Sequence, residues 1–245
     1  MLDIFAPHGA SVHVAVADTP ASKKLHYRLR YQVYCQRLAY EDPARFPDGE
    51  ERDHYDEDAV QFVAYDRRCA DWAGTLRLVH PGPAGLPMTS VTGLEPDIKT
   101  LVNMERVLEI SRVCVRALSP VADTCSHGGA FDAMSRTAPL VFFSLVRASV
   151  AYAFQAGISH LAFLTTPSLL RLLRRLGIQH MPAGDACMHR GLRYPRILDV
   201  AGEFCRLVER VVDHPLGPHT SVEPYQAFSS LVSGLSHQEN QVAFG

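Results

Sequence analysis

Residues 107–117 read VLEISRVCVRA, and they supply the strand around which the other predicted elements can be arranged. β-branched and other apolar residues dominate the segment, which is typical of a strand buried inside a sheet. Two upstream segments, AVQFVAY at 59–65 and AGTLRLVH at 73–80, show β-branched, aromatic and alternating residues. They predict an antiparallel hairpin with a turn at 66–72.

Helices are predicted on both sides of these strands along the chain. Leu25, Leu29 and Val33 stand four residues apart, a spacing that predicts a helix over 22–36. The later predicted elements are a buried helix at 138–156 ending at Gly157, a strand at 160–166, a helix at 167–177, a strand pair within 178–200 and a terminal helix near 202–213. This order predicts an α/β (α+β) fold with a mixed central sheet flanked by helices.

The signatures of several other enzyme folds are missing from the sequence. A Rossmann domain needs strict alternation of strands and helices and a GxGxxG turn, and the chain has neither. It also has no Walker loop, GxSxG elbow or HExxH motif. Residues 37–58 follow no secondary-structure period and carry two prolines and a cluster of acids, which predicts a long loop of the functional or disordered kind.

The overall composition excludes some classes of partner. The 245 residues carry a formal net charge of −2 and are 47% hydrophobic, which argues against wholesale binding to nucleic acid or to an anionic membrane. The N-terminus lacks the pattern of a secretory signal. No stretch reaches the roughly 20 apolar residues needed to span a bilayer. We therefore expect a cytoplasmic protein without a membrane span.

The cysteines are scattered and form no CxxC pair. They stand at positions 35, 69, 114, 125, 187 and 205. This spacing favours reduced thiols over a disulfide framework or a zinc ribbon. Cys187 with His189 and Cys125 with His127 offer only two neighbouring ligands each, so we expect no metal site.

The residues that can carry chemistry gather in four short segments of the first half of the chain. These are RYQVYCQRLAY with Arg30, Tyr34 and Tyr40, ERDHYDED with Asp53 and Asp56, GTLRLV with Arg77, and LEISRVCV with Glu109, Ser111 and Arg112. In this order the segments resemble those of the acyl-homoserine-lactone (autoinducer) synthases of the GNAT superfamily. Residues 27–56 are even more similar to a sister group, the acyltransferases associated with the PEP-CTERM/exosortase protein-sorting system.

The resemblance implies a fold and a reaction. It covers roughly residues 22–200 and implies a single GNAT-like acyl-CoA N-acyltransferase domain over 1–215, followed by a C-terminal tail of uncertain order over 216–245. The implied reaction moves a fatty acyl group from an acyl carrier protein or CoA thioester to a small-molecule amine by direct attack. No tightly bound cofactor is implied. The usual GNAT loop for the CoA pyrophosphate is missing after residues 109–112, which favours the acyl carrier protein as donor.

Glu109 is the candidate general base that takes the proton of the amine. Backbone N–H groups of the central strand can stabilise the developing oxyanion. The other interpretation is that Glu109 forms an ion pair with Arg112 or Arg77 that holds strands together. Strand alternation places Glu109 and Arg112 on opposite faces unless a bulge intervenes, so Arg77 is the more plausible partner. Together with Glu109, we assign Arg77, Ser111 and Arg112 to the catalytic group.

The remaining candidates are substrate and carrier contacts. Tyr34, Tyr40, Arg30, Asp53 and Asp56 are assigned to substrate binding. The two aspartates would hold a cationic acceptor or organise Arg30 and Arg77, unless they belong to a solvated charged loop.

Three arginines of the helix at 167–177 share one helical face, namely Arg171, Arg174 and Arg175. This face either docks an acidic carrier protein or is an ordinary solvated surface. The apolar residues of 138–156 and 160–166 can line a pocket for the acyl chain.

Two alternatives stay open. The chain can be an acyl-homoserine-lactone synthase that uses S-adenosylmethionine, although Tyr34 and Tyr40 stand where those synthases favour Phe and Trp. It can also be a GNAT-fold binding or adaptor protein without catalytic activity. Release of a thiol from an acyl thioester separates an enzyme from an adaptor, and dependence on S-adenosylmethionine separates the two enzymes.

Overall fold

A computed structural model of the protein describes residues 11–83, 85–116, 130–209 and 223–242. Its strands are β1 (Val12–Val16), β2 (Ala59–Asp66), β3 (Asp71–Val79), β4 (Val107–Val115), β5 (His160–Thr165), β6 (Met181–Pro182), β7 (Cys187–Met188), β8 (Leu192–Asp199) and β9 (Gln226–Ala227). They form one sheet in the order β6-β8-β5-β4-β3-β2-β1-β9, with β7 paired to β8. The β4–β5 and β1–β9 pairs are parallel and the other described pairs are antiparallel, which confirms the predicted mixed sheet.

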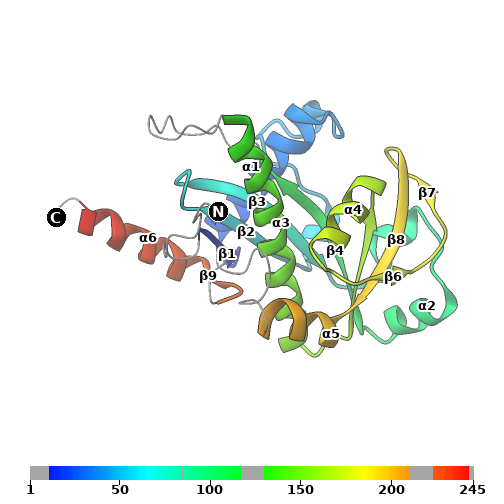
Figure 1. Ribbon diagram of the computed structural model, residues 1–245. Coiled ribbons are helices and arrows are strands. Elements are labelled where there is room, and N and C mark those ends of the chain that lie inside the picture. The colour runs from blue at the N-terminus through cyan, green and yellow to red at the C-terminus, as the bar shows by residue number, and fades with distance from the viewer. Residues whose placement is uncertain (1–10, 84, 117–129, 210–222, 243–245) are drawn as a thin grey trace.

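Helices cover both faces of this sheet (Figure 1). They are α1 (Pro20–Tyr31), α2 (Pro96–Asn103), α3 (Ala130–Gln155), α4 (Pro167–Arg175), α5 (Val200–Phe204) and α6 (Phe228–Val242). Helices α3, α4 and α5 pack on one face in a large apolar core, and α3 crosses the front of the sheet in Figure 1. Helices α1 and α6 pack on the other face near β1 and β2, and α2 packs on that face near β4 and β5.

Alternation along β4 separates an apolar face from a polar one. Leu108 and Ile110 join the core beneath α3, whereas Val107 joins the smaller core beneath α2. Glu109 and Ser111 therefore share the α2 side of the sheet with Val107. The polar residues singled out by the sequence thus lie on the side of the sheet opposite α3.

Several predicted elements differ from the structure at their ends. The N-terminal helix begins at Pro20 rather than at 22, because Thr19 caps it and forms a capping box with Ser22. Helix α3 begins at Ala130 rather than at 138. The terminal helix predicted near 202–213 is α5 followed by a π-helical turn, Cys205–Glu209, and the rest of that range lies outside the described residues.

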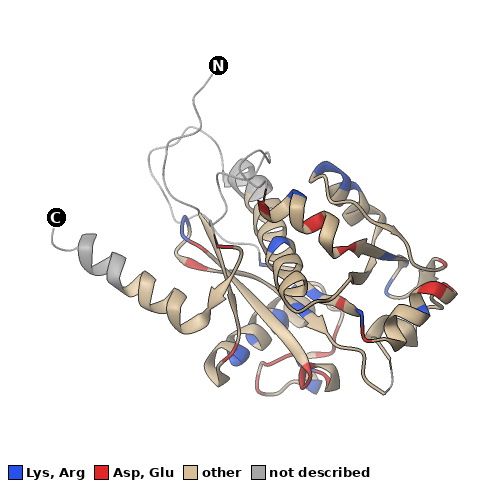
Figure 2. Cartoon of the chain, turned by 90° about the horizontal axis from the view of Figure 1, so that it is seen from below, with Lys and Arg blue, Asp and Glu red and all other residues tan. Residues whose placement is uncertain are grey.

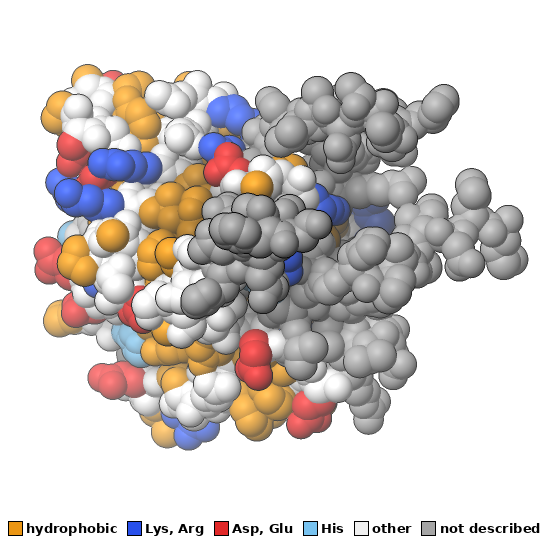
Figure 3. Space-filling view, turned by 90° about the vertical axis from the view of Figure 1, so that its left-hand side faces the viewer, with side chains coloured by type: hydrophobic (Ala, Val, Ile, Leu, Met, Phe, Trp, Pro, Cys, Tyr) orange, Lys and Arg blue, Asp and Glu red, His pale blue; other side chains and the backbone are white. Residues whose placement is uncertain are grey.

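Other elements were not predicted. Residues 81–97, for which no helix or strand was predicted, contain a 3₁₀ turn, Pro87–Ser90, and the start of α2. In the segment expected as a tail, β9 pairs with β1, and Leu231 of α6 packs into the core beneath α1. Residues 228–236 of α6 carry no charged side chain (Figure 2). Hydrophobic side chains also gather on the face of the molecule from which α6 projects (Figure 3).

Helix α3 contains the one described segment that is long and apolar enough to cross a membrane, Thr137–Gln155. Within the protein, 72% of its most apolar window is buried. The helix contacts β1, β2, β3, β4 and β5. It is therefore the central core helix of this fold, packed against the sheet by the apolar side chains that give it its hydropathy.

Gly74 permits the close approach of α3 to the sheet and gives a test of this packing. A Cβ atom at Gly74 would lie 2.7 Å from the carbonyl oxygen of Cys114 and 2.9 Å from Cγ1 of Val141. We expect Gly74→Ala to lower the free energy of unfolding by about 1–3 kcal/mol, because the backbone oxygen cannot move without distorting β4. Urea denaturation measures the change. Gly93→Ala is the control, since a Cβ there meets nothing within 4 Å; equal losses in both variants would contradict the packing argument.

Candidate functional site

The site lies where two parallel strands separate. β4 and β5 pair from Val107–His160 as far as Ile110–Phe163. Beyond that point a cleft of about 440 Å³ opens between the strands. Its walls include Ser111 of β4 and Thr165 of β5. The structure therefore contains an open slot between these two strands.

A β-bulge shapes the β4 wall of this cleft. Thr75 pairs with Cys114 and Arg77 pairs with Ser111, so two residues of β4 oppose Leu76 alone. Arg112 is the first of these two and has a φ of 48°, in the left-handed region. This bulge is the exception that the sequence analysis allowed for, and it returns the side chain of Arg112 to the polar side of the sheet, where Glu109 lies.

A network of buried charges lies behind and beside the bulge. Nε of Arg30 is 2.5 Å from Glu51, and its Nη1 is 2.6 Å from Oδ1 of Asp56. Nη1 of Arg77 lies 2.8 Å from the same oxygen of Asp56 and 2.5 Å from Asp53. These contacts fasten the loop at 37–58 to helix α1 and strand β3.

Arg112 extends the network toward the mouth of the cleft. It lies 3.0 Å from Asp53, 3.1 Å from Glu51 and 3.5 Å from Glu41. Glu41 in turn lies 2.5 Å from Arg190, which precedes β8. The loop at 37–58 is therefore joined across the cleft mouth to the turn between β7 and β8.

The aspartates of the loop are ionised because of this pairing. Burial alone would raise the pKa of Asp56, but Arg30 and Arg77 outweigh it and hold that pKa well below its usual range. The pKa of Asp53 is lowered as well, since Arg77 and Arg112 outweigh its burial. Asp53 and Asp56 thus organise the arginines, one of the two roles expected from the sequence, and they do not form a solvated loop.

Glu109 has a different environment from these acids. Its side chain is buried and lines the cleft, and it accepts a hydrogen bond of 2.7 Å from the backbone N–H of Met88. Burial raises the pKa of Glu109 to about 8, although Met88, Arg77 and Arg112 act in the opposite direction. The contacts of the two arginines go to other acids, so the ion pair considered for Glu109 does not form.

The other residues of the catalytic group meet at the same place. Nε of Arg77 donates to Oγ of Ser111 over 3.1 Å. Ser111, Arg112 and Glu109 all line the cleft, as does Arg77. The structure therefore brings together the four side chains that the sequence assigned to catalysis.

Two tyrosines support the cleft from the loop side. The hydroxyl of Tyr34 donates to the carbonyl of Val113 over 2.7 Å, and its ring lies beneath the guanidinium of Arg112. Tyr40 stacks on Tyr34 with ring centroids 6.4 Å apart and lies beneath Arg190. Both rings line the cleft, whereas Arg30 is fully buried and not among the cleft residues. Arg30 is thus a support of the site and does not contact a substrate there.

The far wall of the cleft is apolar. Its side chains come from β4, α3, β5, α4 and β8, namely Ile110, Phe142, Val146, Phe163, Leu169, Leu173 and Leu198. Such a surface suits a hydrocarbon chain. It also agrees with the expectation that the helix at 138–156 and the strand at 160–166 line an acyl pocket.

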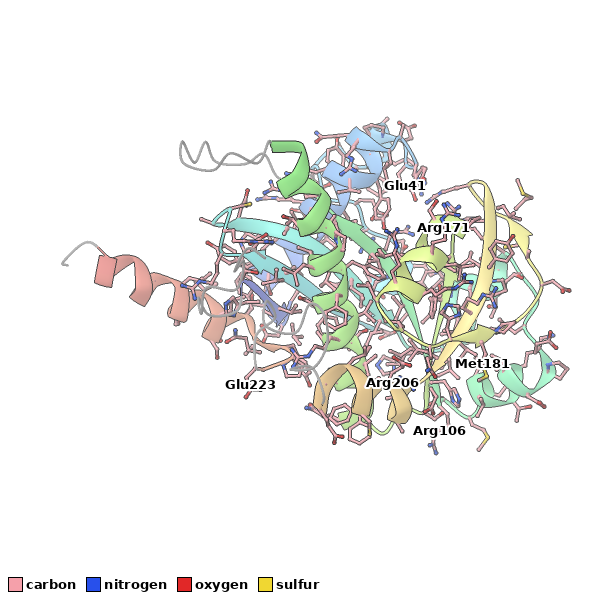
Figure 4. All side chains as sticks on the ribbon, viewed as in Figure 1. Glu41, Arg106, Arg171, Met181, Arg206 and Glu223 are labelled. Atoms are coloured by element: carbon pink, nitrogen blue, oxygen red, sulfur yellow. The ribbon has the colours of Figure 1, made fainter. Side chains whose placement is uncertain are left out.

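The arginines of α4 lie outside the cleft. Arg171, Arg174 and Arg175 are exposed, while Leu169 and Leu173 of the same helix reach the cleft wall. Glu41 and Arg171 lie at the same end of the molecule, opposite Arg106 (Figure 4).

Sequence reasoning missed several residues of the site. Glu41, Glu51, Arg190 and Arg193 were not singled out, and Met88 lies in a segment for which no element was predicted. His189 was considered only as half of a metal pair. It lines the cleft, and the described residues hold no group of three metal-ligating side chains. The pair of Cys125 and His127 lies outside the described residues.

Comparison with known proteins identifies the fold. Residues 29–118 match the family of the Acetyltransferase (GNAT) domain. No match is found among the curated proteins. The chain is similar in structure to BjaI, a CoA-dependent acyl-homoserine lactone synthase solved with SAM and isopentyl-CoA. Their sequence identity is 21% over 84% of this chain and 91% of BjaI, with a TM-score of 0.54.

Two further solved structures agree with this result. TofI, solved in a ternary complex with an inhibitor and MTA, is 22% identical over 80% of this chain and 96% of its own, with a TM-score of 0.53. MesI, a CoA-dependent acyl-homoserine lactone synthase, is 21% identical over 82% of this chain and 95% of its own, with a TM-score of 0.52. The chain therefore has the GNAT fold in the form found in acyl-homoserine lactone synthases.

Asp56 gives a test of the buried network. We expect Asp56→Asn to lower the free energy of unfolding at pH 7 by about 3–5 kcal/mol, because it leaves Arg30 and Arg77 incompletely compensated. Because the pKa of Asp56 is depressed on folding, its contribution is present above its unfolded pKa of about 3.9 and is lost as the pH falls through the folded value. Stability should therefore fall less steeply below pH 5 in the variant.

The control for this measurement is Asp48→Asn. Asp48 pairs with Arg52 over 2.8 Å at the surface, where solvent screens the interaction, so we expect a change below about 0.5 kcal/mol. Urea denaturation at several pH values measures both variants. If Asp56→Asn and the wild type lost stability in parallel below pH 5, the paired carboxylate of Asp56 would not be the group responsible.

Proposed function

We propose that this chain is an N-acyltransferase that moves a fatty acyl group from a thioester to an amine inside the β4–β5 cleft. The observation that carries the proposal is the position of Glu109, a buried carboxyl beside an apolar wall and at the point where two parallel strands separate. Carboxyls with a raised pKa that line a cleft are typical of catalytic sites.

The donor can be held between the two strands. Past Ile110 and Phe163, the facing backbone groups of β4 and β5 no longer pair with each other. A phosphopantetheine arm can lie between the two strands and pair with these backbone groups as a further strand would. Its acyl chain would then lie against Phe142 and Val146. Backbone N–H groups of this wall would stabilise the oxyanion that forms on the thioester carbonyl.

The acceptor amine must lose its proton to react. We assign Glu109 as the group that accepts it, directly or through a water molecule. The neutral amine then attacks the thioester carbonyl and the C–N bond forms. The C–S bond breaks, the proton held by Glu109 passes to the leaving thiolate, and the nitrogen of the new amide loses its second proton to solvent. A pKa of about 8 for Glu109 suits both proton transfers, from the amine and to the thiolate, near neutral pH. A group whose pKa is close to the working pH can both accept and release a proton at a small cost in free energy.

The first experiment measures thiol release when the protein meets acyl-CoA or acyl carrier protein thioesters and a panel of amines. We expect release with the wild type, and Glu109→Gln should lower kcat by about 10²–10⁴-fold while donor binding stays near normal. The glutamine amide oxygen can still accept the hydrogen bond from Met88, so the local structure is retained. The wild-type rate should rise with pH up to about 8, and this ionisation should be absent from the variant.

Glu203→Gln is a matched control for this experiment. Glu203 is also buried with a raised pKa, and it accepts a hydrogen bond from the backbone of Gln179, but it does not line the cleft. We expect its turnover to equal that of the wild type. Unchanged turnover in Glu109→Gln would remove Glu109 from the mechanism, and absence of thiol release from every donor would leave the chain a binding or adaptor protein.

The proposal includes an acyl carrier protein as the donor, with Arg171, Arg174 and Arg175 as its contact. These exposed side chains stand on α4, whose other face forms part of the apolar wall. We expect Arg174→Glu/Arg175→Glu to lower kcat/KM for an acyl carrier protein thioester about tenfold at low salt, because the carrier is acidic. The rate with the corresponding acyl-CoA should not change; an equal loss with both donors would show that α4 is not a carrier contact.

A second candidate is an acyl-homoserine lactone synthase. The structural similarity to BjaI, which was solved with SAM and isopentyl-CoA, favours including it. Thiol release that depends on S-adenosylmethionine would identify this reaction, and release with ordinary amines would exclude it. For either reaction we propose that the protein works on thioesters in the cytoplasm. The resemblance to the acyltransferases of the PEP-CTERM/exosortase system remains part of this proposal.

A further inference from the structure

The charges around the cleft form an almost closed set. Four arginines and four carboxylates contact one another in a continuous network, namely Arg30, Arg77, Arg112 and Arg190 with Glu41, Glu51, Asp53 and Asp56. The formal charges of these eight groups cancel. The exposed Arg45 also pairs with Glu41, but it does not line the cleft. Each of these arginines already has a carboxylate partner, so none is available to a ligand without breaking a buried or half-buried ion pair.

Arg193 of β8 stands outside this set. It lines the same cleft, is partly exposed, and donates a hydrogen bond of 3.3 Å to the carbonyl of Leu192. Among the residues that the structure describes, it has no carboxylate within ion-pair distance. Its guanidinium therefore keeps most of its donors available to a molecule in the cleft.

The two other titratable groups nearby do not balance this charge. The carboxyl of Glu109 is mostly protonated at neutral pH, because burial raises its pKa to about 8. His189 is mostly neutral, because burial and the cations of Arg190 and Arg193 lower its pKa. At neutral pH the described part of the cleft therefore presents one uncompensated positive charge, on Arg193.

We infer that Arg193 binds the carboxylate of the acceptor, and that the acceptor is an amino acid rather than a simple amine. This inference rests on the proposed acyl transfer and specifies its substrate class. A zwitterionic amino acid matches both features of the cleft, since its ammonium group gives a proton to Glu109 in its ionised form, which grows in share as the pH rises toward 8, and its carboxylate accepts two hydrogen bonds from a guanidinium. The diphosphate of CoA carries more negative charge than one arginine compensates.

The test measures binding and turnover separately. Calorimetry compares a panel of amino acids with their primary amides, and the thiol-release assay then uses the same compounds with one acyl donor. We expect the wild type to favour amino acids over amides at least tenfold in Kd and in kcat/KM. Arg193→Gln should raise the Kd and KM for amino acids about 10–100-fold, leave amides unchanged and leave the donor KM unchanged, whereas Arg193→Lys should retain part of the preference.

Arg106→Gln is the control, because Arg106 is exposed at the opposite end of β4 from the cleft (Figure 4). We expect it to match the wild type in every measurement. Equal binding of amino acids and amides by the wild type would overturn the inference, whether or not acyl transfer occurs. An Arg193→Gln variant in which only the donor KM rose would also overturn it, by assigning Arg193 to a donor phosphate. Selective binding of amino acids without thiol release would contradict the proposed function alone.

Discussion

One carboxylate oxygen, Oδ1 of Asp56, joins three parts of the chain that are distant in sequence. It lies 2.6 Å from Arg30 of α1 and 2.8 Å from Arg77 of β3, while Asp56 itself belongs to the loop at 37–58. Burying three charges together is costly, and the pairing only compensates for their desolvation. We therefore attribute to this contact a positional role. It fixes where the loop lies against the sheet and so where the cleft mouth forms.

The bulge in β4 depends on that arrangement. A non-glycine residue with a φ of 48° carries backbone strain, and Arg112 is held there by contacts on both sides of its side chain. Glu51 and Asp53 hold its guanidinium, and Tyr34 contacts both that guanidinium and the carbonyl of Val113. The bulge begins two residues after Ile110, the last residue of β4 that pairs with β5. The charge network therefore lies next to the point at which the cleft opens.

Local patterns predicted the parts of the fold that local forces determine. The hairpin, the central strand and the helices α1, α3 and α4 were recognisable because their periodicity and caps lie within short segments. Strand β1 and the β9–α6 segment were not, since their positions depend on pairing with distant residues such as Phe62 and Val63. Glu41 and Glu51 were missed for a similar reason. In the sequence they are two more acids of a charged loop, and only the fold shows that arginines bury them.

The same network gives one acid of the cleft a different environment from its neighbours. Asp53 and Asp56 are ionised near neutral pH, because arginines hold their pKa values below the usual range. Arg77 and Arg112 also act on Glu109, but their N–H groups point to those aspartates and to Glu51. Among the described residues, the hydrogen-bond donor to Glu109 is the backbone N–H of Met88. Burial therefore dominates its pKa. By satisfying the arginines, the structural acids leave Glu109 free to exchange a proton near neutral pH.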